Sequence, residues 1–175
     1  MVVRSSWSEA PGTRLTSRRG RPLNQAGLEL GSPVDGVEQM EHQAVIALSH
    51  IPDQPGIAAR LFETLSGAGI NVDLIIQSTH EGSSNDITFT VAEADLEAAR
   101  RVSQTVLDSL GGELAAEGGM TKLSISGAGI MGRPGIAAGL FHCLSQQGIN
   151  LRLIATSEVK VSCVIDADSG RKALQ

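Results

Sequence analysis

The chain has 175 residues, of which 41% are hydrophobic and 19% charged, and it carries a formal net charge of −5 at pH 7. This composition is that of a folded protein with one ordinary domain or two small ones, and it excludes a wholly disordered chain. No run approaches the roughly 18 consecutive apolar residues of a membrane-spanning helix. The acidic balance argues against nucleic acid as the main partner, because phosphate contacts need a basic surface.

The N-terminal region, residues 1–32, shows no sustained period of either a strand or a helix. Residues 1–22 hold five arginines against a single acid, Glu9, and an Arg-rich, acid-poor start is compatible with a transit peptide. The simpler interpretation, which we favour, is a flexible tail or a piece of a neighbouring domain that leads into a linker. Residues 33–43 are expected to continue this linker with one short extended piece, and ordered structure should begin near Ala44.

The most informative feature of the sequence is an internal repeat. Residues 55–78 match residues 134–157 at 15 of 24 positions without a gap, which chance does not produce. Pro-Gly-Ile-Ala-Ala opens both copies, and Gly-Ile-Asn follows in both. The chain therefore contains two copies of one structural unit, which we place at residues 44–118 and 119–175.

Each copy is predicted to run strand, helix, strand, strand. Apolar or alternating runs of strand length lie at residues 44–49, 70–77 and 86–91 in the first copy and at 122–126, 149–155 and 160–165 in the second. The helices open at Pro55 and Pro134, because proline is favoured in a first helical turn, and they carry apolar residues at helical spacing. Residues 93–110 add a second helix to the first copy, and the second copy has no room for an equal one. We predict an α+β fold with two ferredoxin-like βαββαβ units, each an antiparallel sheet with helices on one face.

Motifs for catalysis are weak in this chain. No GxxxxGK[ST] phosphate loop occurs, and the glycine cluster at residues 127–132 lacks the acidic residue that a dinucleotide site needs about 20 positions on. The four histidines have no metal-ligand spacing. Cys143 and Cys163 fall in apolar runs, as is typical of buried free thiols in a reducing compartment, so we expect a cytoplasmic location. We expect no catalytic residue, metal or cofactor in this chain.

A binding site is better supported, at residues 53–56 between a strand end and a helix start. Unpaired N–H groups at a helix N-terminus suit a carboxylate, and Asp53 on the same loop suits an ammonium group. These two features match the two ends of an α-amino acid, although Asp53 and Pro55 are also ordinary turn and helix-start residues. Asn71, Asp73 and Gln77 alternate on the next strand and share one face, which is turned either to solvent or to that loop.

Two sets of segments carry a family resemblance. They are residues 52–59, 69–73, 77 and 86–91 in the first copy and residues 122–125, 127–129, 133–135, 148–151 and 156–162 in the second. These segments resemble the tandem ACT domains at the C-terminus of aspartokinase (aspartate kinase). Residues 3–13 are similar to the last stretch of the family's kinase lobe, so the resemblance covers nearly the whole chain.

The resemblance implies a regulatory region that is not catalytic by itself. In the family a kinase lobe, absent here, uses ATP and Mg to phosphorylate L-aspartate on the route to lysine, threonine and methionine. ACT units of the family pair side by side between chains. The implied partners are a second copy in a homodimer, the aspartokinase catalytic lobe or alpha subunit, and lysine and/or threonine, with no nucleic acid and no membrane. Because the family interleaves its two units, the short strand near residues 34–39 is implied to belong to the second ACT sheet.

By position, the resemblance also assigns residues to an effector site. Those of the first copy are Asp53, Gly56, Ile57, Ala58, Asn71, Asp73 and Gln77, and those of the second are Met131, Arg133, Ile149, Asn150, Ser157 and Glu158. Arg152 and the loop at residues 131–133 depart from the family's pattern. They leave open an alternative, an ACT pair that dimerises and scaffolds the kinase lobe without a working effector site. Catalysis by this chain alone is the weakest hypothesis.

Overall fold

The computed structural model describes residues 2–3, 13–14, 34–80, 84–130 and 133–174. The chain divides into two compact units, Met1–Gly31 and Ser32–Gln175. The described residues of the first unit form two short strands, β1 (Val2–Val3) and β2 (Thr13–Arg14), which pair in antiparallel fashion. The rest of the expected tail at residues 1–32 lies outside the described residues.

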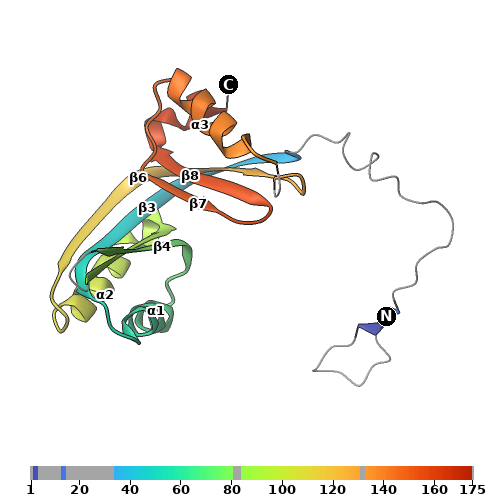
Figure 1. Ribbon diagram of the computed structural model, residues 1–175. Helices are drawn as coiled ribbons and strands as arrows, with labels where there is room; N and C mark the ends of the chain where they lie inside the picture. The colour runs from blue at the N-terminus through green and yellow to red at the C-terminus, as the bar shows by residue number, and fades with distance from the viewer. Residues whose placement is uncertain (1, 4–12, 15–33, 81–83, 131–132, 175) are drawn as a thin grey trace. The chain divides into compact units, whose positions relative to one another are not determined.

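The second unit contains a six-stranded antiparallel sheet with the strand order β4-β5-β3-β6-β8-β7 (Figure 1). The strands are β3 (Gly36–Pro52), β4 (Val72–His80), β5 (Ser84–Ala92), β6 (Glu113–Ser126), β7 (Leu153–Thr156) and β8 (Lys160–Asp166). The described helices of this unit are α1 (Ile57–Gly67), α2 (Leu96–Leu107), α3 (Ile136–Gln146) and α4 (Gly170–Ala173), with 3-10 turns η2 (Glu93–Asp95) and η3 (Ala167–Ser169). The predicted α+β class with antiparallel strands is confirmed.

The two repeats share the long strands β3 and β6, which pair with each other along most of their length. In the first repeat, the latter part of β3 pairs with β5, and β5 pairs with β4. The fourth strand of this repeat is the start of β6, where Val45–Ser49 pair with Glu113–Glu117. In the second repeat, the latter part of β6 pairs with β8, and β8 pairs with β7. The fourth strand of this repeat is the start of β3. The short strand expected near residues 34–39 lies at the start of β3, where Gly36–Met40 pair with Lys122–Ser126 of β6. β3 itself begins at Gly36, before the start that was expected near Ala44.

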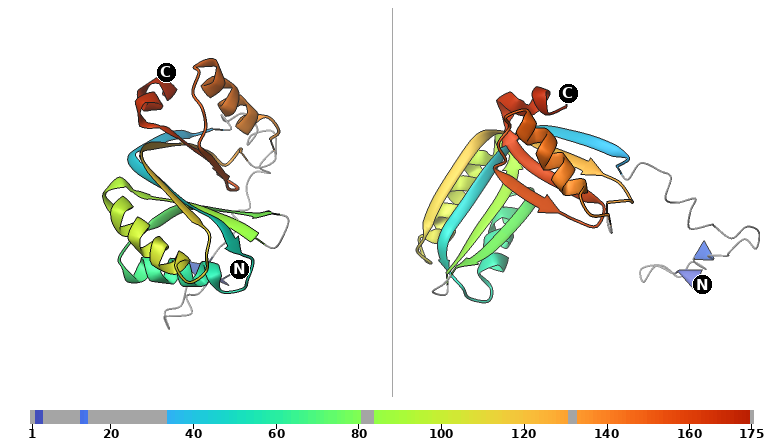
Figure 2. Two further views of the ribbon diagram at one scale, coloured as in Figure 1. Left: turned by 90° about the vertical axis from the view of Figure 1, so that its left-hand side faces the viewer. Right: turned by 45° about the horizontal axis from the view of Figure 1, so that its top comes forward.

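Both shared strands bend where they pass from one repeat to the other. β3 has register shifts between Met40 and Val45 and a positive φ of 55° at His42, and Gly119 in β6 has a φ of 69°. Irregularities of this kind increase the local twist and redirect a strand. The helix-free faces of the two repeats meet in a small apolar cluster formed by Met120, Leu153 and Val164 with Val45, Leu74 and Ile76. Figure 2 shows α1 and α2 on one side of these strands and α3 on the other.

The first helix of each repeat begins at a glycine in the left-handed conformation. Gly56 precedes α1 with a φ of 95°, and Gly135 precedes α3 with a φ of 97°. L-residues rarely adopt such angles, so the repeated Pro-Gly pair sets the direction in which each helix leaves its strand. α1 buries Ile57, Leu61 and Leu65 against the first sheet, which confirms the expected apolar face.

The two cysteines differ in environment. Cys163 on β8 is fully buried, and this burial raises the pKa of its thiol to about 11. Cys143 is exposed on α3, so the prediction of two buried thiols is wrong for Cys143, whose apolar neighbours in sequence lie on other faces of the helix.

We expect one thiol of the native protein to react with an aromatic disulfide reagent at pH 8, and the second only after unfolding. The thiolate is the reactive form, and Cys163 is both inaccessible and protonated at this pH. The check is a spectrophotometric thiol count with and without urea, repeated on Cys143→Ser, which should show no fast-reacting thiol. Two equally fast thiols in the folded protein would contradict the burial of Cys163.

Candidate functional site

A pocket of about 290 Å³ lies at the N-terminal end of α1 and is called the α1 pocket here. Its lining consists of the continuous segment Ile51–Ala58 with Gln77, Asn85 and Ile87. Five residues that the sequence analysis assigned to an effector site line it together, namely Asp53, Gly56, Ile57, Ala58 and Gln77. Residues from the end of β3, from β4 and from the start of β5 thus meet at one end of the first repeat.

The loop between β3 and α1 is shaped by its backbone. The pairing of β3 with β5 shifts between Leu48 and Ile51, and His50 in this bulge has a φ of 57°. A non-glycine residue rarely adopts such an angle. Its backbone N–H donates to the Asp86 Oδ1 atom at 3.0 Å, which holds the bulge in place. The strand end that carries Asp53 is therefore anchored to β5.

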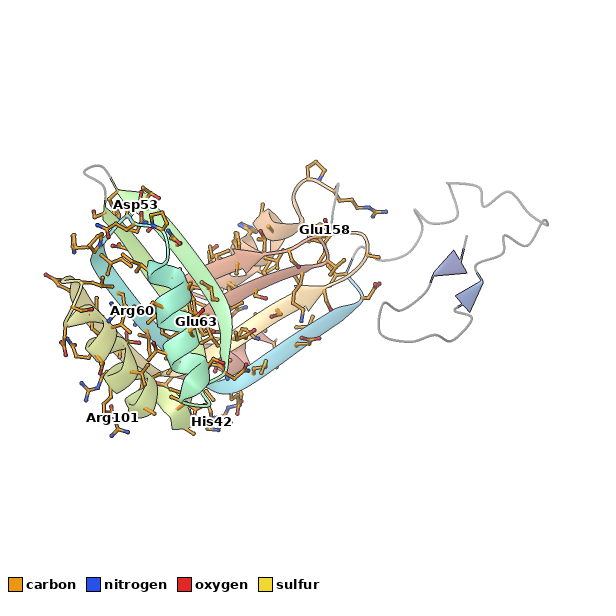
Figure 3. The ribbon with its side chains drawn as sticks, turned by 90° about the horizontal axis from the view of Figure 1, so that it is seen from below. His42, Asp53, Arg60, Glu63, Arg101 and Glu158 are labelled. Carbon is orange, nitrogen blue, oxygen red and sulfur yellow. The ribbon has the colours of Figure 1, made fainter. Side chains whose placement is uncertain are left out.

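Two features give the α1 pocket its electrostatic character. The first backbone N–H groups of an α-helix have no intrahelical acceptor and form the positive end of the helix dipole. At α1 this end lies in the pocket wall at Ile57 and Ala58, where the Ile57 N–H makes a long hydrogen bond of 3.5 Å to the Gln54 carbonyl oxygen. The carboxylate of Asp53 lies on the same loop and is exposed (Figure 3). The pocket therefore offers a site for an anionic group and a site for a cationic group.

Asn85 also lines the pocket and was missed by the sequence analysis. Its side chain is 5% exposed, and its Nδ2 atom donates to Asp53 Oδ1 at 2.8 Å. The one signal in the sequence was a polar residue directly before the apolar run at residues 86–91. Its pairing with Asp53, 32 positions away, could not be inferred from that.

The neighbouring carboxylate of Asp86 is ionised and structural. The hydrogen bond with the His80 ring at 2.8 Å and the backbone N–H of His50 hold the pKa of the Asp86 carboxyl below its ordinary value. Its charge is already engaged by His50 of β3 and His80 of β4, and Asp86 does not line the α1 pocket. Asp53 is the exposed carboxylate in the pocket lining.

Asn71 and Asp73 do not join the α1 pocket. They line a second pocket of about 260 Å³ where the two repeats meet, together with Met40, Gln43 and Lys122. Asp73 pairs there with the ammonium of Lys122, whose side chain is only 10% exposed. This pair joins β4 of the first repeat to β6 in the second, which makes a structural role the better interpretation of Asp73.

The expected site residues of the second repeat differ in their exposure to solvent. Ile149 is buried in the core of that repeat, whereas Arg133, Asn150, Ser157 and Glu158 are exposed. Met131 lies outside the described residues. Figure 3 labels Asp53 and Glu158, which belong to different repeats. Within the described part of one chain these residues do not line the α1 pocket.

A family model described as an ACT domain matches residues 46–105 and 123–175. The solved regulatory subunit of aspartate kinase from Thermus thermophilus, in its ligand-free form, is 38% identical, and the match covers 82% of this chain and 95% of that one with a TM-score of 0.76. The chain belongs to the ACT-domain regulatory subunits and regions of aspartate kinase.

Other members of the family are longer than this chain. Aspartate kinase from Synechocystis is 43% identical with a TM-score of 0.81, and the match covers 98% of this chain but 31% of that structure. A curated aspartokinase from Thermus thermophilus is 37% identical, and the match covers 99% of this chain and 41% of that protein. This chain thus spans about two fifths of the length of the curated relatives it matches.

Arg152, which departs from the family's pattern, has a place in the fold. Its guanidinium donates to Asp166 Oδ1 at 2.8 Å and lies 3.8 Å from Glu117 Oε1. The hydrogen bond and charge of Asp166, together with the charge of Glu117, raise the pKa of Arg152 above its ordinary value. Arg152 therefore links the second repeat to the strand segment that β6 contributes to the first.

Two features are absent from the described residues of this ACT-domain region. Among them, no helix is long and apolar enough to cross a membrane. Within the same part of the chain, no group of three or more His, Cys, Asp or Glu side chains is arranged to hold a metal ion.

We expect Asp73→Ala to destabilise this ACT-domain region more than Lys122→Met. Removing Asp73 takes the paired carboxylate away from a buried ammonium, at a cost of about 3–5 kcal/mol. Removing the charge of Lys122 leaves a carboxylate that is 39% exposed and can be hydrated, which costs about 0–1 kcal/mol. Urea unfolding of both variants measures the difference in stability. Equal losses of stability would contradict a structural ion pair in which the lysine is the more deeply buried partner.

Proposed function

We propose that this chain is the regulatory part of an aspartate kinase and binds lysine or threonine in the α1 pocket to feedback-inhibit phosphorylation of L-aspartate. The observation that carries the proposal is the presence of Asp53 and the N-terminus of α1 in one pocket of about 290 Å³. A carboxylate and an array of N–H donors complement the ammonium and carboxylate of an α-amino acid. Gln77 on β4 lies in the same wall and is available to the ligand's side chain.

The proposed assembly is a homodimer of this chain bound to an aspartate kinase catalytic lobe or alpha subunit, which would itself hold ATP and Mg. Ile75 on β4 and Ile154 on β7 support the dimer, because they occupy equivalent repeat positions on the two outermost strands and are 51% and 40% exposed. We propose that Asn150, Ser157 and Glu158 of a second copy complete the pocket across this interface. A ligand bound by two chains favours the one arrangement in which both contact it, and only such a difference in affinity can shift activity.

Isothermal titration of the purified chain with lysine, threonine and methionine separately tests the proposal. Binding of lysine or threonine, with the D-enantiomer binding far more weakly, is expected, because the helix terminus, Asp53 and Gln77 form an asymmetric three-point site. Sedimentation with and without ligand reports the dimer in the same samples. Absence of binding by all three amino acids would overturn the proposed function.

A second candidate function is an ACT pair that dimerises and scaffolds the kinase lobe without an effector. It is favoured by the second repeat, where the positions equivalent to Asp53 and Gln77 are Gly132 and Thr156. A chain that sediments as a dimer, supports the kinase lobe and binds none of the amino acids would establish this alternative.

A further inference from the structure

The side chain of Asn85 is arranged unusually for a buried amide. It lies at the start of β5 in the wall of the α1 pocket and is 5% exposed. Its Nδ2 atom donates to Asp53 Oδ1 at 2.8 Å, whereas its Oδ1 atom is buried and has no hydrogen-bond partner among the described residues. Buried side-chain acceptors are nearly always paired, and an unpaired one destabilises the folded protein.

The orientation of this amide follows from its neighbour. A carboxylate only accepts hydrogen bonds, so the amide nitrogen must face Asp53, and the reverse orientation would set two oxygens against each other. Asp53 therefore fixes the direction of the Asn85 oxygen. This oxygen is a buried acceptor beside the exposed carboxylate, and both residues belong to the wall of the α1 pocket.

We propose that Asn85 is a ligand-binding residue whose Oδ1 atom accepts a hydrogen bond from the α-ammonium group of the bound amino acid, while its Nδ2 atom positions Asp53. The inference rests on the proposed function and deepens it. A primary ammonium has several N–H donors, so it satisfies Asp53 and the unpaired oxygen of Asn85 together. A group with a single donor satisfies only one of them.

The second repeat lacks this pair of acceptors. Ile75 on β4 pairs with Phe89, and its repeat counterpart Ile154 on β7 pairs with Cys163. This register makes Val159 the counterpart of Asn85, and Val159 is 53% exposed with an apolar side chain. Ammonium recognition by an acid and an amide is thus confined to the first repeat.

The test compares two ligands on three proteins by isothermal titration. The ligands are lysine or threonine, whichever the unaltered chain binds, and the analogue in which a hydroxyl replaces the α-ammonium. The proteins are the unaltered chain, Asn85→Ala and Asn85→Ser, each checked for folding by circular dichroism and urea unfolding. Gln104→Ala is the control, because it removes an exposed side-chain amide on α2 outside the pocket.

Asn85→Ala is expected to weaken binding of the amino acid at least tenfold and binding of the hydroxy acid less than threefold, with Asn85→Ser intermediate and Gln104→Ala unchanged. Equal weakening of both ligands would mean that Asn85 only positions Asp53, and unchanged affinity would mean that it does neither. Both results overturn the inference and leave the proposed function intact. If the unaltered chain binds neither lysine nor threonine, the proposed function and this inference fail together.

Discussion

Asp53→Ala is expected to reduce the affinity of the chain for lysine or threonine by about 30- to 1000-fold. The ammonium of the ligand would lose its charged partner while it stays in a partly desolvated pocket, a loss that typically costs about 2–4 kcal/mol. Asp53→Asn keeps an acceptor of the same shape and removes the charge, so its loss should be smaller. It also gives Asn85 a neutral partner, because the Nδ2 atom that donates to Asp53 Oδ1 at 2.8 Å would then donate to an amide oxygen.

The matched control for this prediction is Glu63→Ala. Glu63 is an exposed acid on α1 beyond the pocket lining (Figure 3), so its removal changes the net charge as Asp53→Ala does without removing a pocket group. Titration calorimetry at one salt concentration compares the two variants. If Glu63→Ala weakened binding as much as Asp53→Ala, the effect would be one of overall charge, and the assignment of Asp53 to the ammonium would be wrong.

Phe89→Ala is expected to destabilise the chain by about 3–5 kcal/mol, which is the usual cost of removing a buried aromatic side chain. Phe89 on β5 is fully buried in the core of the first repeat, and its ring meets that of Phe62 edge to face with the centroids 5.6 Å apart. The loss combines apolar area returned to water with a cavity that the sheet and α1 cannot close. The free energy of unfolding of an ordinary domain is about 5–15 kcal/mol in total, so this variant should be near the limit of folding.

Urea unfolding followed by circular dichroism measures this loss as a shift of the midpoint at an unchanged slope. Val159→Ala is the control, because that side chain is 53% exposed and its truncation should change the stability by less than about 0.5 kcal/mol. A Phe89→Ala midpoint close to that of Val159→Ala would show that the first repeat can repack around the missing ring.

Local features of the fold could be predicted from the sequence. The repeated Pro-Gly pairs place the starts of α1 and α3, because Gly56 and Gly135 adopt left-handed angles that favour glycine. The apolar period of residues 57–65 predicts the buried face of α1. The grouping of Asp53 with Gly56 follows from their closeness in the chain, and the grouping of both with Gln77 came from the family resemblance.

The sequence therefore predicts the repeat, the type and order of its elements, and the loop that begins the candidate site. The folded chain was needed to show that β3 and β6 serve both repeats, that Asp73 pairs with Lys122 rather than lining the α1 pocket, and that Asn85 donates to Asp53. Periodicity reports which side of an element is buried but not which distant strand pairs with it. Contacts across 32 and 49 positions depend on the bends at His42 and Gly119 and on the strand register, and the register leaves no local pattern.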